Sequence, residues 1–301
     1  MELIIVNGLY LGAQYALIAL GLTLIFALMN VLNFAHGQMF VLGGFVTYGI
    51  TEKLFNGLGL ALPLAFICGL LAAVVVLMIV GALFERFLFR TVTKRSARDE
   101  STMLLAAGTA FLLDSIILIV FGQQQKGLPD GKKLISGIFQ WDGIIIAYDR
   151  ILVAAISVLM ITAFILYMQW SRTGRAMRAL AQDKMAATLM GVNVDFYTML
   201  GFAFGAALAG IVGGLLFSVT GINSGLGDPT SVKAFTMVML GGAGVVSGAI
   251  WGGVILGMLE SVLLSLLPLI GLGDLTHFII FASLMVFLAI RPQGLMGKPW
   301  G

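Results

Sequence analysis

Charged residues are scarce in this sequence of 301 residues. Asp, Glu, Lys and Arg make up only 10% of the chain, whereas a soluble domain carries about 25%. Hydrophobic residues account for 60%, and the mean hydropathy is +1.06. So few charges cannot cover a surface that faces water. The composition therefore excludes a soluble domain and predicts an integral membrane protein that crosses the bilayer several times.

Cysteine and histidine are nearly absent, which excludes further classes of protein. The single cysteine, Cys68, cannot form an internal disulfide, and with only His36 and His277 there is no Cys/His zinc spacing. No glycine-rich run is followed by the Lys-Ser/Thr of a phosphate-binding loop. We therefore expect no enzyme and no cofactor in this chain. The net charge of +3 comes from basic residues beside apolar runs, so it does not indicate nucleic-acid binding.

The apolar runs predict an all-α polytopic membrane protein, with residues 1–301 forming a single transmembrane permease domain. A helix needs about 20 mainly apolar residues to cross the hydrocarbon core, and about eight segments qualify. They are 6–29, 34–51, 60–84, 102–121, 150–170, 196–219, 232–267 and 274–290. The seventh is too long for one crossing. Its glycines predict a broken or re-entrant helix near 241–253, and the NFAHG sequence predicts another near 30–38.

The distribution of Lys and Arg predicts the orientation in the membrane. Two strongly basic loops, 85–101 and 171–195, are expected in the cytoplasm, and 122–149 is expected to be periplasmic. Eight simple crossings would leave the basic tail outside. A second entry into the membrane near 241–253 returns the tail to the cytoplasm and leaves the N-terminus external.

The two interruptions lie in opposite halves of the sequence, which indicates a transport pathway in transporters built from repeats. For the first interruption a second interpretation stays open, because Asn33 can satisfy the free amides of a helix start. The residues predicted to line a pathway are Asn33, His36, Gln38, Gly241, Gly242 and Gly244.

Two carboxylates fall within apolar segments, and each is a candidate for a functional polar group. Asp114 lies in the segment 102–121, and Glu260 lies in the second half of 232–267. Neither has an identifiable partner in the sequence. A proton relay needs a chain of such groups, so two isolated carboxylates argue against a proton-coupled transporter.

The loop 171–195 carries the clearest local pattern. Residues 176–190 suit a short amphipathic helix, on which Leu180, Ala187 and Met190 share one face. Gly191 is suited to end the helix, because a left-handed backbone costs glycine nothing. Such a helix can dock in a groove of a partner. A solvated basic loop that only fixes topology explains the same residues.

Several stretches resemble the permeases of bacterial ATP-binding-cassette (ABC) importers. Residues 185–191 (MAATLMG) resemble their "EAA…G" signature, although Met185 replaces the acidic residue. Residues 174–183 (GRAMRALAQD), 30–38 (NVLNFAHGQ), 241–253 (GGAGVVSGAIWGG) and 291–297 (RPQGLMG) resemble the branched-chain amino-acid ABC transporter permease family of the LivH type. The similarity covers essentially the whole chain.

The resemblance implies one subunit of an ATP-driven importer in the bacterial inner membrane, carrying leucine, isoleucine and valine. A same-family permease for urea or short amides is the alternative, and a self-sufficient secondary transporter is a third. The implied partners are a second permease, two cytoplasmic ATP-binding subunits that hold ATP and Mg²⁺, a periplasmic binding protein and membrane lipid. The residues implied to couple to the ATPases are Gly174, Arg175, Arg178, Ala181, Asp183, Ala186, Ala187 and Gly191.

Overall fold

The computed structural model describes residues 2–95, 99–141 and 144–297 and is mostly helical. Six helical segments of the described part are long and apolar enough to cross a membrane. They are α1 (Glu2–Met29), α3 (Leu62–Leu83) with its continuation to Arg95, α5 (Asp99–Phe121), α6 (Tyr148–Trp170), α9 (Val194–Thr220) and α11 (Val246–Leu266). The chain is thus a polytopic helical membrane protein, as the composition predicts.

Three further helices accompany these long segments. They are α2 (His36–Glu52), which continues through a π-helical turn to Gly57, α10 (Gly227–Gly241) and α12 (Thr276–Ile290). The predicted polytopic fold of about eight segments with broken helices is confirmed. Segment 34–51 corresponds to α2, segment 274–290 corresponds to α12, and segment 232–267 divides into α10 and α11. The predicted break near 241–253 is confirmed, but it is confined to residues 242–245.

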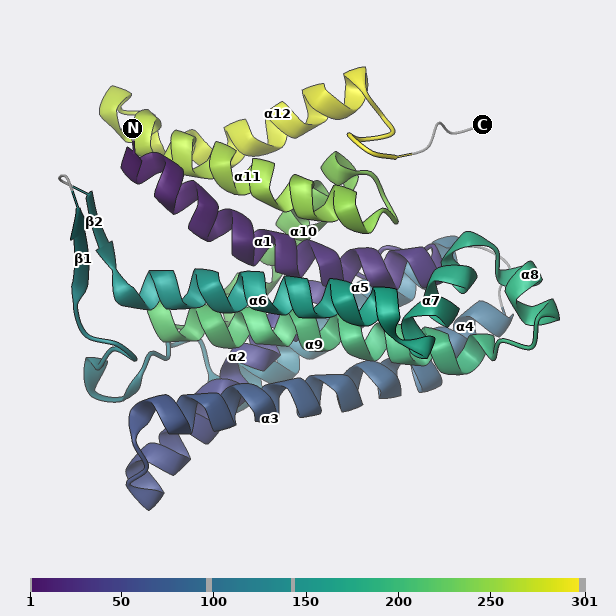
Figure 1. The fold of residues 1–301 in the computed structure, drawn as a ribbon, viewed down its shortest axis with the longest axis horizontal. Helices are drawn as coiled ribbons and strands as arrows, with labels where there is room; N and C mark the ends of the chain where they lie inside the picture. Colours follow the sequence, from purple (N-terminus) through teal and green to yellow (C-terminus); the bar gives the residue numbers. More distant parts are fainter. Residues whose placement is uncertain (1, 96–98, 142–143, 298–301) are drawn as a thin grey trace.

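The long helices run between two polar ends of the molecule (Figure 1). At one end lies an antiparallel hairpin of β1 (Ile138–Trp141) and β2 (Ile144–Ala147), in which Ile138 pairs with Ala147. At the other end lie α7 (Arg172–Gln182) and α8 (Lys184–Leu189). We call these the hairpin end and the α8 end. The N-terminus lies at the hairpin end, and the tail after α12 returns to the α8 end.

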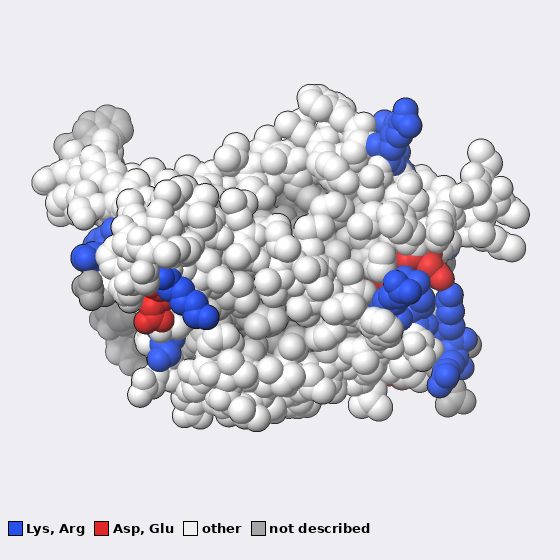
Figure 2. Space-filling view, turned by 90° about the horizontal axis from the view of Figure 1, so that it is seen from below, with Lys and Arg blue, Asp and Glu red and all other residues white. Residues whose placement is uncertain are grey.

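Charged side chains gather at these two ends and leave a broad uncharged band between them (Figure 2). A band free of charge is what the hydrocarbon core requires of the surface that it contacts. The long axes of the helices therefore lie across the membrane, with both polar ends outside it.

Two of the predicted loops are more ordered than the sequence indicates. Most of 85–101 is helix, because α3 continues through a π-helical turn (Phe84–Phe89) into α4 (Arg90–Arg95). Residues 96–98 of that loop lie outside the described residues. The stretch 122–149 contains a 3₁₀ turn (Pro129–Gly131) and the β-hairpin, so the all-helical prediction does not extend to this segment.

The core forms around α1 and α9, the two most buried helices. Glycines let the α11 backbone approach α1 closely. A Cβ atom at Gly253 would lie 2.5 Å from the Cα atom of Ala16, and one at Gly257 would lie 2.5 Å from that of Gly12. Glycines of this kind are the usual means of packing helices in lipid, where van der Waals contact replaces the hydrophobic effect.

A valine at Gly253 should therefore destabilise the protein, because its side chain has no room against α1. We expect Gly253→Val to cost about 1–3 kcal/mol, as overpacked cores do, measured as a lower thermal midpoint of the detergent-solubilised protein. Gly49→Val in α2 is the matched control, since a Cβ at Gly49 meets nothing within 4 Å. Equal midpoints for the two variants would contradict this account of the α1–α11 contact.

Candidate functional site

The helix α2 begins inside the protein, level with the middle of α1. The Nε2–H of His36, its first residue, donates to the carbonyl oxygen of Ile18 at 3.2 Å. Since α1 ends at Met29, residues 30–35 must fold back from the α8 end into the interior. The predicted interruption near 30–38 is thus confirmed as a re-entrant segment followed by a half-length helix.

The first turn of α2 meets the first turn of α10. The amide of Gly37 donates to Ser231 Oγ at 2.9 Å, and that hydroxyl donates to the carbonyl oxygen of Phe34 at 2.9 Å. Gln38 Nε2 donates to Asp228 Oδ1 at 3.1 Å. Two half-length helices therefore begin side by side in the interior. We call Asn33, His36, Gln38, Asp228 and Ser231 the helix crossing.

Three of the predicted pathway residues are buried at the crossing. Asn33, His36 and Gln38 are each at most 1% exposed. Asn33 Oδ1 accepts from the amide of Ala35 at 3.1 Å, so Asn33 stabilises the re-entrant turn. Asp228, which the sequence analysis did not single out, is the exposed member of the crossing. The pair Asp228-Pro229 is typical of a helix start and could have indicated this residue from the sequence.

The other three predicted pathway residues lie at the opposite end of α10. Gly242 and Gly244 adopt positive φ angles of 106° and 79° and turn the chain from α10 into α11. The C-terminal tail covers this turn, where Met296 N–H donates to the carbonyl oxygen of Gly241 at 3.0 Å. Gly241 packs directly on Gly248. The structure therefore does not bring these glycines and His36 into one site.

Two carboxylates reach the surface between the two polar ends of the molecule. Asp228 is exposed at the start of α10, and Asp114 is half-exposed on α5. Asp114 forms no hydrogen bond or ion pair with any described residue. The helix α5 contacts the 3₁₀ turn Ser224–Leu226, which leads into α10. A carboxylate within an apolar span must face water or another protein. The surface around Asp228 at the start of α10 is therefore the candidate pathway wall, and Asp114 on α5 is a second candidate for it.

The second predicted polar residue, Glu260, belongs to a buried ion pair. Lys233 Nζ lies 2.6 Å from Glu260 Oε1 and donates to Tyr15 Oη at 2.9 Å. Tyr15 donates in turn to Glu260 Oε2 at 2.6 Å. This triad joins α1, α10 and α11. The sequence alone did not predict a role for Lys233, although a lysine within an apolar run indicates a paired or functional polar group.

The predicted coupling loop is two helices instead of one over 176–190. Ser171 Oγ accepts from the amide of Gly174 at 2.8 Å and caps α7. Asp183 Oδ1 accepts from the amide of Met185 at 2.8 Å and caps α8. Asn193 caps α9 in the same way. The chain breaks at Asp183 because that side chain competes for the backbone amides of the helix.

The helix α7 is held firmly against the end of α6. Arg175 Nη1 donates to the carbonyl oxygen of Trp170 at 2.9 Å, and Arg178 Nη2 donates to that of Gln169 at 3.3 Å. Cations are favourable at these carbonyls because the helix dipole is negative there. Gly174, one of the implied coupling residues, is buried inside α7, and a Cβ there would lie 2.5 Å from Met168 Cα.

Ionic contacts fix the neighbouring helices at the same end. Lys94 Nζ lies 2.5 Å from Asp195 Oδ2, and Arg90 Nη2 lies 2.5 Å from Glu85 Oε2. Arg90 also donates to the carbonyl oxygen of Asp195 at 2.8 Å. These contacts tie α4 to the first turn of α9, immediately after α8.

The helix α8 projects from this end and exposes large apolar side chains. Met185, Leu189 and Met190 are 77%, 81% and 84% exposed. We call these three residues the α8 knob. Ala187 is 5% exposed, so the predicted shared face of Ala187 and Met190 is wrong. The helix α8 ends just before Gly191, which has a φ of 82°, as predicted, while Ala181 and Ala186 are exposed.

Comparisons with known proteins give a consistent result. Residues 4–289 match the family model described as the permease component of the branched-chain amino acid transport system. The chain is 32% identical, over 98% of its length and 95% of the relative, to the "High-affinity branched-chain amino acid transport system permease protein BraD" of Pseudomonas aeruginosa. The LivH permease of the same description from Escherichia coli is also 32% identical, over 97% of this chain and 94% of that protein.

Among solved structures, PsaBC from Streptococcus pneumoniae in complex with Fab aligns with a TM-score of 0.47 and 15% identity, over 95% of this chain and 91% of that chain. A similarity this low supports no conclusion.

The buried ion pair gives a prediction about stability. We expect Lys233→Met to lower the stability by about 3–5 kcal/mol, because it leaves the Glu260 carboxylate buried without a cation. The double variant Lys233→Met/Glu260→Gln removes both charges and should regain most of that loss. Thermal midpoints of the solubilised protein measure both effects. A double variant no more stable than Lys233→Met would show that the charges do not act as a pair.

Proposed function

The chain belongs to the permease family of the branched-chain amino acid transport system, and from this premise we propose that it is the transmembrane subunit of an ATP-driven importer for leucine, isoleucine and valine. A permease component is part of a transporter and not an enzyme. The substrate class follows the names of the relatives, which are branched-chain amino acid permeases.

The observation that carries this proposal is the α8 knob. The helix α8 lies at a polar end of the molecule (Figure 1), outside the uncharged band, so lipid does not account for the exposure of Met185, Leu189 and Met190. Exposed apolar side chains at such a place suit a hydrophobic groove on a partner. We assign this surface to one of two cytoplasmic ATP-binding subunits, which hold ATP and Mg²⁺ and hydrolyse the nucleotide, and the other subunit binds the second permease.

The α8 end then faces the cytoplasm of a bacterial inner membrane. The basic residues of α4 and α7 lie at this end, which agrees with the preference for Lys and Arg in short cytoplasmic loops. The hairpin end faces the periplasm, where a binding protein delivers the substrate.

The candidate pathway wall suits a second permease subunit. In the single chain Asp228 is exposed and Asp114 is partly exposed. A facing permease subunit would enclose a polar passage around them. The carboxylate of Asp228 complements the ammonium group of an amino acid, which urea and short amides lack. The exposed carboxylate thus favours an amino acid as the substrate over the neutral solutes.

Transport by the complete complex in proteoliposomes tests this function. We expect ATP-dependent uptake of labelled leucine, and little uptake of labelled urea. In the variant Met185→Lys/Leu189→Lys the ATP-binding subunits should no longer co-purify and uptake should fall at least tenfold, because two buried charges would replace the apolar contact.

The matched control is Gln182→Lys, which adds a charge at an exposed position of α7 without altering the α8 knob. It should keep both the ATP-binding subunits and uptake. Unchanged uptake in the double variant would contradict coupling through α8, and uptake of urea without leucine would contradict the proposed substrate.

Cysteine labelling tests the pathway wall. In a Cys68→Ser background of the complete complex in membranes, we expect Asp228→Cys to react with a charged methanethiosulfonate reagent and leucine to slow the reaction. The reason is that the thiolate forms only where water reaches it.

Leu71→Cys on α3 is the control, because Leu71 is 61% exposed within an apolar span and should face lipid. It should stay unlabelled. Equal labelling at the two positions, or none at 228, would contradict a water-filled passage beside α10.

A further inference from the structure

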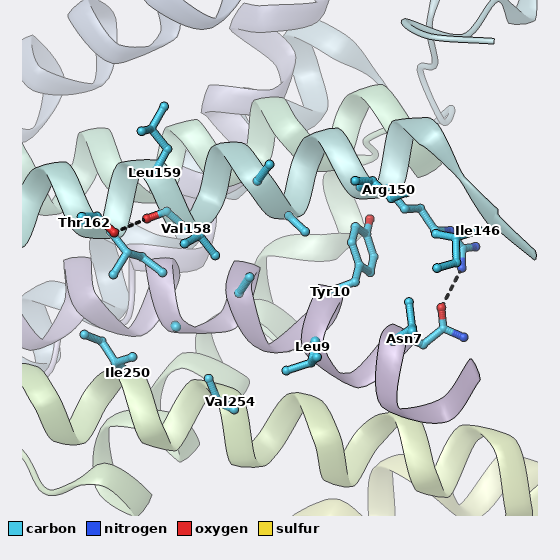
Figure 3. A pocket seen from close by; sticks show the side chains of 17 residues that line it. Asn7, Leu9, Tyr10, Ile146, Arg150, Val158, Leu159, Thr162, Ile250 and Val254 are labelled. Carbon is cyan, nitrogen blue, oxygen red and sulfur yellow. Dashed lines mark hydrogen bonds between the residues drawn. The ribbon is translucent and has the colours of Figure 1, made fainter. Parts of the chain in front are cut away.

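A long groove opens between α1, α6 and α11, away from the helix crossing and from the α8 knob. Its volume is about 880 Å³. Small side chains hollow it out on both walls, and Figure 3 shows how α1 and α6 diverge around it. The alanines that line it are Ala13, Ala16, Ala154 and Ala155. The remaining lining is almost entirely apolar, so the groove suits an apolar occupant.

One cation stands at the hairpin end of this groove. Arg150 is the only charged residue in the lining, and its side chain is exposed. Its Nη1 donates to Asn7 Oδ1 at 3.0 Å, and its guanidinium lies 5.8 Å from the ring centroid of Tyr10 (Figure 3). The other guanidinium hydrogens have no partner among the described residues. The neighbouring carboxylate of Asp149 is buried and does not line the groove.

The length and the charge distribution of the groove suit a lipid. From Arg150 to Thr162 the groove follows α6 for roughly 18 Å, at 1.5 Å per residue. This length is close to one leaflet, about half of the 30 Å hydrocarbon core. The lining is almost entirely apolar along this length, and its one charged residue lies at the hairpin end, where a lipid headgroup would lie.

We propose that this groove binds one phospholipid of the leaflet at the hairpin end. Its acyl chains lie along the alanines of α1 and α6, and its phosphate accepts hydrogen bonds from Arg150. An arginine guanidinium recognises phosphate with paired N–H donors, and Asn7 and Tyr10 hold it at the depth of a lipid headgroup. The lipid fills the space between α6 and the α1–α11 pair, and α6 is the helix whose last turn binds α7.

Native mass spectrometry of the complete complex tests the proposal. The complex is taken from nanodiscs of palmitoyl-oleoyl phosphatidylglycerol and phosphatidylethanolamine into dodecyl maltoside and washed. The wild type should retain a phospholipid. In Ala155→Trp, which fills the groove, and in Arg150→Gln, which removes the phosphate ligand, the retained phospholipid should fall at least fivefold.

Ala163→Trp is the matched control, because Ala163 is exposed on the same helix outside the groove. It should retain phospholipid as the wild type does. Folding of each variant is checked by its thermal midpoint and by co-purification of the partner subunits. Equal retention in Ala155→Trp and Ala163→Trp would overturn the proposal. A photo-crosslinker at position 155 that captures a second permease instead of lipid would also overturn it.

Discussion

A peptide group in the hydrocarbon core has no water to bond, so every break in a helix at that depth must find partners within the protein. Among the described residues, two such breaks lie in the interior, before α2 and before α10, and contacts distant in the sequence satisfy them. In the first, Ser231 bonds the carbonyl oxygen of Phe34, and Asn33 bonds the amide of Ala35.

At the second break, the backbone groups find hydrogen-bond partners in the segment that follows α5. Lys126 and Ile222 exchange two backbone hydrogen bonds of 2.8 Å, and Gln125 Nε2 donates to the carbonyl oxygen of Thr220. These hydrogen bonds hold the segment between α5 and the β-hairpin against the turn that leads into α10. Residues distant in the sequence therefore hold the start of each half-length helix.

Rigid connections link the α8 end to the centre of the protein. Arg175 and Arg178 join α7 to α6, and α7 also contacts α1 and α9. The Lys233–Glu260–Tyr15 triad then joins α1 to α10 and α11. Packed helices and charge-assisted hydrogen bonds therefore connect α7, which precedes α8, with the helices that form the crossing.

The sequence predicted the membrane class, most of the long spans and the break at Gly242, because each depends on local composition. It did not separate half-length from full helices, because an apolar run does not show at what depth in the protein its helix begins. It also left Glu260 without a partner. Lys233 is 27 residues away and Tyr15 is 245 residues away, and only the fold brings them together. The start of α10 was overlooked because the prediction placed the functional interruption at the glycines after it.

The helix crossing also contains unsatisfied polar groups. His36 Nδ1 and Gln38 Oε1 are buried and have no hydrogen-bond partner among the described residues. They are two of six such side-chain atoms in the described part of the chain, and the others belong to Tyr10, Gln14, Thr23 and Thr51. Each unpaired buried acceptor costs about 1–3 kcal/mol. The two half-helices also direct the positive ends of their dipoles to the crossing, which the Asp228 carboxylate offsets in part. A rearrangement that brings a donor to His36 or Gln38 would therefore recover free energy at the crossing.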